Sequence, residues 1–248
     1  MSKRADLNSL IDDLASADPD VRDHRALGAL AGGIQDGEYD QSARAQIATA
    51  MLEHLRHPQI QARTFAPLIL AVLVEHGDWK DAWFPAVRDW YLAEQDLRGY
   101  DHDLGWLHAV AHGADFFGAC GVARRVAAAD LLNVLAARAV APTDLAWADM
   151  EEIRVALAMT HCLTDPALDT QGAIAWVRVV RDGLGEPGPT GPAAAWTNTV
   201  RMLTALHVAL GQRVQLNGES VVIPLAEPVR EQVARTLAST TPWFWQTA

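Results

Sequence analysis

The apolar residues of this chain recur at helical spacing, and this periodicity constrains the fold more than any other feature. In the first segment, leucine and isoleucine residues stand three or four positions apart, as on one face of an amphipathic helix. Similar segments of roughly 12 to 20 residues follow along the chain. Pairs such as Asp18-Pro19, His57-Pro58 and Asp165-Pro166 separate them, because proline cannot continue a helix but suits its first turn. We therefore predict an all-α fold.

About ten helices are expected from the apolar spacing and the helix start and stop signals. Eleven segments carry these signals, with approximate bounds 5–16, 19–33, 41–56, 59–75, 79–91, 104–117, 122–140, 144–163, 166–182, 193–210 and 227–237. Gly32-Gly33 is expected to end the second helix, and Pro67 is expected to kink or split the fourth. Arg22 and Asp23, in the first turn of the second helix, are expected to pair on a solvated face.

Short connections between amphipathic helices are typical of stacked antiparallel helix pairs, as in a HEAT-like α-solenoid or an α/α superhelix. Near the C-terminus the period changes, and residues 213–223 alternate around Asn217-Gly218, which predicts one small β-hairpin. We expect a single domain over residues 1–248. Residues 183–192, rich in glycine and proline, are the best candidate for a sub-domain boundary or a mobile loop.

The overall composition excludes several classes of partner. The formal net charge of -11 argues against nucleic acid, because nucleic-acid binding needs a basic surface. The longest apolar run, residues 65–74, is about half the length of a membrane span, so no membrane is expected. Cys120 and Cys162 show no disulfide or metal-binding pattern, which favours the cytoplasm. The aromatic tail at 242–245 is expected to pack onto the body or onto a second copy in a homodimer.

One stretch, residues 96–117, holds the densest mixture of Arg, Tyr, Trp, His and Asp in the chain. Asp103 is a suitable N-cap, and the helical period predicts a helix from Leu104 onward. Its apolar stripe would face the core and consists of Trp106, Val110, Gly113 and Phe117. The preceding helix carries an aromatic stripe that would be core or one wall of the same groove, and that consists of Trp79, Trp83, Val87, Trp90 and Tyr91.

His108, His112 and Asp115 would share the opposite face of the predicted helix. Two imidazoles at i and i+4 can bind one metal ion, and Asp115 could be a third ligand, so a divalent metal is one hypothesis. Arg98 and Tyr100 precede the helix and could fold over this face, where Arg98 would bind an anionic group. The alternative interpretation is a polar network that fixes the loop against the helix.

The motifs R-G-Y at 98–100, G-W-L-H at 105–108 and A-H-G-A-D at 111–115 are also informative as a set. Together they resemble the signature of an uncharacterised bacterial family of soluble, all-helical proteins, a domain of unknown function. The resemblance extends to D-P-D-V-R-D at 18–23 and D-M-E-E-I-R at 149–154, and covers roughly residues 5–165. It implies a helical-repeat fold and no particular activity.

The sequence contains no nucleotide-binding glycine motif and no nucleophile elbow. Two hypotheses of function follow from the residues at 96–117. The first is a non-catalytic helical-repeat protein that binds a small molecule or protein partner in a groove lined by Arg98, Tyr100, Trp106, His108, His112 and Asp115. The second is a metal-dependent, hydrolase-like enzyme. In it the two histidines and Asp115 would be ligands, Arg98 would hold an anionic substrate, and Tyr100 would donate a proton or hydrogen bond.

Overall fold

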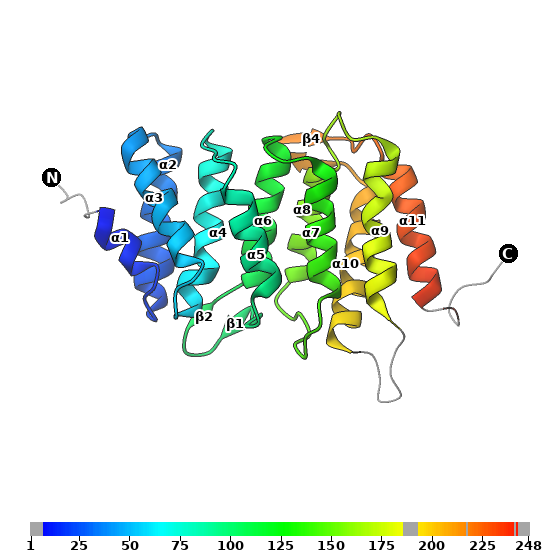
Figure 1. Ribbon diagram of the computed structural model, residues 1–248, viewed down its shortest axis with the longest axis horizontal. Coiled ribbons are helices and arrows are strands. Elements are labelled where there is room, and N and C mark those ends of the chain that lie inside the picture. The colour runs from blue at the N-terminus through cyan, green and yellow to red at the C-terminus, as the bar shows by residue number, and fades with distance from the viewer. Residues whose placement is uncertain (1–6, 186–192, 217, 241, 243–248) are drawn as a thin grey trace. The chain divides into compact units, whose positions relative to one another are not determined.

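The structure is a computed structural model, and it describes residues 7–185, 193–216, 218–240 and 242. Over these residues the chain forms eleven α-helices, one π-helix and two short antiparallel strand pairs (Figure 1). The prediction of an all-α fold is confirmed. The contacts between residues divide the chain into two compact units, residues 1–119 and residues 120–248.

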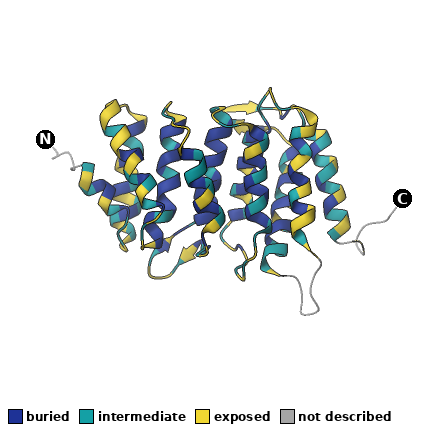
Figure 2. Cartoon of the chain, in the orientation of Figure 1, coloured by how far each residue is buried: buried dark blue, intermediate teal, exposed yellow. Residues whose placement is uncertain are grey.

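The first unit packs short helices around the apolar helix α4. Its elements are α1 (Leu7–Asp13), a π-helix (Asp20–Leu27), α2 (Gly28–Gln35), α3 (Gln41–His54), α4 (Ile60–Glu75), α5 (Trp83–Ala93), β1 (Tyr100–Asp101), β2 (Gly105–Trp106) and α6 (Ala109–Val122), whose last turn belongs to the second unit. Helix α4 packs against α2 and α3, and α3 also contacts α5. Most residues of α4 are buried, which is visible as dark blue in Figure 2 and agrees with the apolar run at 65–74.

The second unit is built from two layers of helices. Its elements are α7 (Ala128–Val140), α8 (Glu151–Cys162), α9 (Thr170–Leu184), α10 (Ala194–Leu210), β3 (Val214–Leu216), β4 (Glu219–Val221) and α11 (Ala226–Thr240). Helices α7, α9 and α11 pack in sequence as one layer, and α8 packs against α10 as the other. Contacts of α7 with α8 and of α10 with α11 join the two layers, so that consecutive helices form stacked pairs.

The predicted C-terminal hairpin is confirmed, since β3 and β4 pair antiparallel with Val214 opposite Val221. Gly218 has a φ of +79°, which suits the expected turn, while Asn217 lies outside the described residues. The division between the units falls within α6, whereas the sequence suggested residues 183–192 as a boundary or mobile loop. Residues 186–192 and the aromatic residues 243–245 of the expected tail also lie outside the described residues.

The predicted split of the fourth helix at Pro67 and the predicted helix end at Gly32-Gly33 are wrong. Helix α4 runs as one helix through Pro67, because the packing of a largely buried helix outweighs one missing hydrogen bond, and the kink expected as the alternative stays a prediction. Helix α2 continues past Gly32 and Gly33 to Gln35. Gly33 serves close packing instead of ending the helix: a Cβ atom there would lie 2.4 Å from Cε2 of Tyr39.

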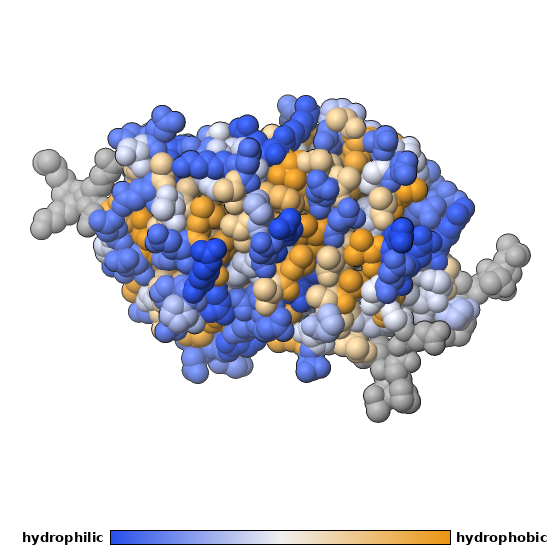
Figure 3. Space-filling view, viewed as in Figure 1, coloured by the Kyte–Doolittle hydropathy of each residue, from blue (hydrophilic) through white to orange (hydrophobic). Residues whose placement is uncertain are grey.

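The face of the molecule drawn in Figure 3 carries both polar and apolar side chains. Hydrophilic side chains cover much of the face drawn in Figure 3, with apolar side chains showing between them. Within the described ranges, none of the helices combines the length and the apolar character that crossing a membrane would require.

Gly113→Ala is expected to lower the free energy of unfolding by about 1–3 kcal/mol, because the new methyl group would overpack the core. A Cβ atom at this position would lie 2.3 Å from Cδ2 of Tyr91. The Tyr91 side chain is 1% exposed, and its hydroxyl donates a hydrogen bond to the Val110 carbonyl oxygen at 3.1 Å, so the ring has little room to move. Urea denaturation followed by circular dichroism measures the change.

Gly32→Ala is the matched control, since it makes the same substitution inside a helix without a clash. A Cβ atom at Gly32 would have no neighbour within 4 Å. We expect this variant to gain about 0.5–1 kcal/mol from the better helix propensity of alanine. Equal changes in stability in the two variants would contradict the assignment of Gly113 to close packing against Tyr91.

Candidate functional site

Residues 100–106, expected in part as the first turns of a helix, form a β-hairpin. Strand β1 pairs antiparallel with β2, and α6 begins only at Ala109. The prediction of Asp103 as N-cap is therefore wrong: Asp103 lies in the hairpin turn, where its amide and that of Leu104 each donate to Asp101 Oδ1 at 2.9 Å. Gly105 has a φ of +71°, which glycine adopts without strain and which interrupts a helix.

The hairpin is held onto the unit by Arg22, whose side chain is fully buried. The guanidinium donates to the carbonyl oxygens of Leu104 at 2.6 Å, Ser16 at 3.2 Å and Trp106 at 3.4 Å. The expected ion pair with Asp23 forms at 2.7 Å. The predicted solvated face is wrong, because the hairpin carbonyl oxygens take the place of water around the guanidinium.

A series of aromatic rings leads from the hairpin towards the core. Tyr100 and Trp106 are 45% and 47% exposed, with ring centroids 4.9 Å apart. The Trp106 ring stacks on His108 at 4.6 Å, and His108 meets His112 edge-on at 5.6 Å. His112 is buried, and its Nδ1 donates to the Thr64 carbonyl oxygen at 3.1 Å. The prediction that Trp106 faces the core is wrong, because Trp106 lies on a strand ahead of the helix.

The backbone of His108 adopts a left-handed conformation, with a φ of 53°. This conformation costs a residue with a side chain on the order of 1–3 kcal/mol, and it persists where neighbouring contacts fix it. The amides of Leu107 and His108 both donate to the Gly99 carbonyl oxygen, at 2.8 and 3.2 Å, and the His112 amide donates to the His108 carbonyl oxygen at 2.9 Å. A strained residue held in this way beside exposed aromatic rings points to a functional constraint.

The three predicted metal ligands are only partly brought together. His108 and His112 are neighbours, as expected from their spacing. Within the residues that the structure describes, no three His, Cys, Asp or Glu side chains form a group that could hold a metal ion. Asp115 is half-buried and acts on Glu75, whose pKa is raised first by burial and also by the negative charge of Asp115. His108 precedes the helix, so the common helix face that the hypothesis assumed does not form.

Arg98, the predicted anion-binding residue, is bound by carboxylates of its own loop. Its Nη2 and Nε donate to the two Asp96 carboxylate oxygens at 2.6 and 2.8 Å, and its Nη1 pairs with Asp101. Hydrogen bonds from Arg98 lower the pKa of Asp96, and those from the Leu104 and Asp103 amides lower the pKa of Asp101. Both carboxylates therefore compete with any external anion for this guanidinium.

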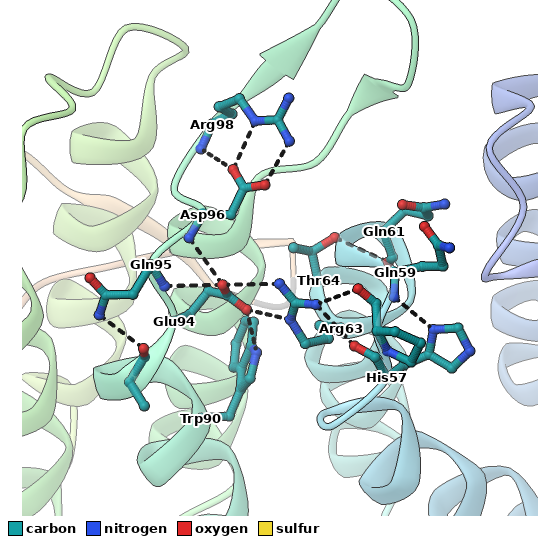
Figure 4. A network of polar contacts seen from close by, with 12 residues as sticks. His57, Gln59, Gln61, Arg63, Thr64, Trp90, Glu94, Gln95, Asp96 and Arg98 are labelled. Carbon is teal, nitrogen blue, oxygen red and sulfur yellow. Dashed lines mark hydrogen bonds and ion pairs between the residues drawn. The ribbon is translucent and has the colours of Figure 1, made fainter.

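A buried carboxylate, Glu94, connects this loop to α4 and α5 (Figure 4). Glu94 Oε2 accepts from Arg63 Nε at 2.6 Å and from Trp90 Nε1 at 3.1 Å. Its Oε1 accepts from Arg63 Nη2 at 3.2 Å and from the amides of Gln95 and Asp96 at 3.0 Å. Burial alone would raise the pKa of Glu94, but these donors, Arg63 foremost, outweigh it and lower the pKa.

Neither Arg63 nor Glu94 stands out in the sequence, although both are central to this network. A partial signal exists, since Trp90 and Glu94 are four residues apart at the end of the aromatic helix and can therefore meet. The aromatic stripe of that helix is confirmed as core for Trp83, Val87, Trp90 and Tyr91, whereas Trp79 lies before α5 and is half-buried. Arg63 lies 31 positions before Glu94, and its approach depends on the folded chain.

Comparison with known proteins places the chain in one family. No curated protein and no solved structure matches it. The model of a family described as Protein of unknown function (DUF2785) matches residues 49–208, more than half of the chain. The match includes the hairpin and α6, but it begins after the D-P-D-V-R-D motif and ends beyond residue 165, so the expected extent of the resemblance is corrected at both ends. The chain belongs to this family of proteins of unknown function, DUF2785.

Proposed function

We propose that this chain is a non-catalytic helical-repeat protein that binds a small molecule or a protein partner at the β1–β2 hairpin. The observation that carries the proposal is the exposed pair Tyr100 and Trp106, backed by the stacked ring of His108. Large aromatic side chains supply contact area at a small cost in conformational entropy, and they dominate the energetics of many binding surfaces. Burying both rings against a ligand would remove most of their exposed apolar area from water.

The hairpin is held rigidly from several sides, which supports a binding role. Arg22, in the π-helix, donates a hydrogen bond to the Leu104 carbonyl oxygen in the hairpin, and Arg98 pairs with Asp101 of β1. Glu94 accepts from the Asp96 amide at the start of the loop. A surface that is rigid before binding loses little conformational freedom on binding, which favours affinity. In this proposal Arg98 positions the hairpin, and the aromatic rings contact the ligand.

We also propose a HEAT-like repeat architecture and a cytoplasmic location for this protein. The two-layer packing of stacked helix pairs in the second unit supports a repeat architecture. Cys120 and Cys162 are buried, and burial raises the pKa of Cys162 to about 12, so its thiol stays protonated. Cysteines that keep their thiol groups are typical of proteins in a reducing compartment. The acidic composition supports partners other than nucleic acid.

Site-specific photo-crosslinking in cells tests the binding surface. A benzophenone amino acid replaces Tyr100, and in a control protein it replaces Arg178, whose side chain is 81% exposed in the second unit. We expect a discrete adduct from position 100 that is absent at position 178 and lost when Trp106→Ala is added. Adducts of equal yield at both positions, or an adduct insensitive to Trp106→Ala, would contradict the proposal.

The alternative is a metal-dependent hydrolase-like enzyme, and it is favoured by the neighbouring rings of His108 and His112. Metal analysis of the purified, untagged protein tests it, with His108→Ala and His112→Ala as variants. Near-stoichiometric metal that falls in both variants would make the enzyme the leading hypothesis. Metal content that does not depend on either histidine would leave the binding protein as the better explanation.

A further inference from the structure

We propose that the cavity between α3, α4 and α5 is a second binding site, and that its ligand is a small organic anion with an apolar body. The cavity has a volume of about 390 Å³, within the range of small-molecule sites in proteins. It lies in the first unit beside the Arg63–Glu94 network (Figure 4) and does not include the exposed rings of the hairpin. Binding at this cavity is therefore independent of the function proposed for the hairpin.

The apolar part of the cavity can hold a flat hydrophobic group. Leu52 and Leu55 line it from the end of α3, and Ala86 and Ala93 line it from α5. Trp90 completes the wall, and its indole is fixed because Nε1 donates to Glu94. Small alanine side chains one turn before and after a fixed indole leave space in which an apolar body can be removed from water.

The charges at the cavity favour a negative group on the ligand. Four charged side chains line it, namely Arg56, Arg63, Asp89 and Glu94. Glu94 is neutralised by Arg63, and Asp89 pairs with Arg88 at 2.7 Å. Arg56 is exposed and makes no ion pair or side-chain hydrogen bond to any residue that the structure describes. Arg56 is therefore the charged side chain at the cavity whose charge is not balanced by a carboxylate of the described residues. The planar donors of its guanidinium match a carboxylate, sulfonate or phosphate.

Arg63 offers a further donor to the same anion. A guanidinium has five N–H groups. The contacts of Arg63 with Glu94, the His57 carbonyl oxygen and the Pro58 carbonyl oxygen account for four of these groups. The remaining N–H of Nη2 belongs to a side chain that is 21% exposed and lines the cavity. An anion bound to Arg56 can therefore also accept a hydrogen bond from Arg63, whose guanidinium is already oriented by Glu94.

Fluorescence titration with 8-anilinonaphthalene-1-sulfonate tests the site, because this probe joins an aromatic body to a sulfonate. Arg56→Ala is expected to weaken binding about threefold or more, the scale of a partly exposed ion pair. Arg178→Ala removes the same charge from an exposed site in the second unit and is expected to change nothing. The uncharged analogue N-phenyl-1-naphthylamine is expected to bind the wild type and Arg56→Ala equally.

Two further variants identify where the probe binds. Ala86→Trp fills the cavity and is expected to remove binding of both probes, while Val208→Lys alters an apolar groove of about 450 Å³ on α8 and α10 and is expected to have no effect. Binding that survives Ala86→Trp, or that is lost in Val208→Lys, would overturn the proposed site. Binding lost in Ala86→Trp but unchanged in Arg56→Ala would overturn the anionic class of ligand.

Discussion

Arg22→Met is expected to lower the free energy of unfolding by about 3–5 kcal/mol. The Arg22 side chain is fully buried, so nothing but protein surrounds the guanidinium. Its loss would leave the carbonyl oxygens of Leu104 and Ser16 without this donor and would remove the cation from the face of the Phe65 ring, 5.0 Å away. Methionine fills a similar volume, so that the measured loss reports mainly on the polar contacts.

The comparison with Arg25→Met separates this effect from the loss of one positive charge. Arg25 belongs to the same π-helix, but its side chain is 53% exposed and pairs with Asp13, so a change of less than about 1 kcal/mol is expected. Chemical denaturation gives both values. Hydrogen exchange of the hairpin amides provides a second readout, because loosening of β1 and β2 should speed exchange in Arg22→Met alone. Equal losses in the two variants would show that Arg22 does not hold the hairpin.

Glu94→Gln is expected to lower the free energy of unfolding by about 3 kcal/mol at neutral pH. The Glu94 side chain is 7% exposed, and its two oxygens accept from Arg63, Trp90 and backbone amides. Glutamine keeps the shape but turns one acceptor into an NH2 donor that faces other donors. Arg63 would also lose its charge partner while remaining largely buried. Glu231→Gln, at an exposed pair with Arg235, is the control, with an expected change of about 0.5 kcal/mol or less.

The difference in stability between the wild type and Glu94→Gln is also expected to depend on pH. The pKa of Glu94 lies below its ordinary value of 4.5 in the folded protein, so the unfolded chain binds the proton more readily. The stabilisation by ionised Glu94 is therefore fully present above about pH 4.5 and is lost as the pH falls through the lowered pKa. The difference in stability between wild type and Glu94→Gln should narrow below pH 4.5. A difference that stays constant down to acid unfolding would contradict this account.

Local chemistry made several features of the fold predictable. The aromatic stripe on α5 follows from spacing alone, and Trp83, Val87 and Trp90 are buried as expected. The C-terminal hairpin likewise follows from alternation around Asn217-Gly218, because a two-residue turn sets the pairing of its own flanking strands. Residues that are close together in the sequence determine the aromatic stripe and the hairpin.

The candidate site was predictable in its residues but not in its geometry. The composition of residues 96–117 pointed to Tyr100, Trp106, His108 and His112, whose rings do lie in succession. Helical period nevertheless placed Trp106 in the core, because a short run of apolar residues cannot reveal that the first helical turn is replaced by a hairpin. The left-handed turn at Gly105 and the contacts of Arg22 favour the hairpin.

By itself, then, the sequence determined the helical class, most of the helices and the stretch in which the aromatic surface lies, since these depend on spacing within a few turns. The tertiary structure alone decided that Arg22 meets the Leu104 carbonyl oxygen 82 positions away and that Arg63 meets Glu94. A charged side chain looks the same in sequence whether water or protein surrounds it. Only the folded chain supplies the acceptors that make burying these guanidinium groups favourable.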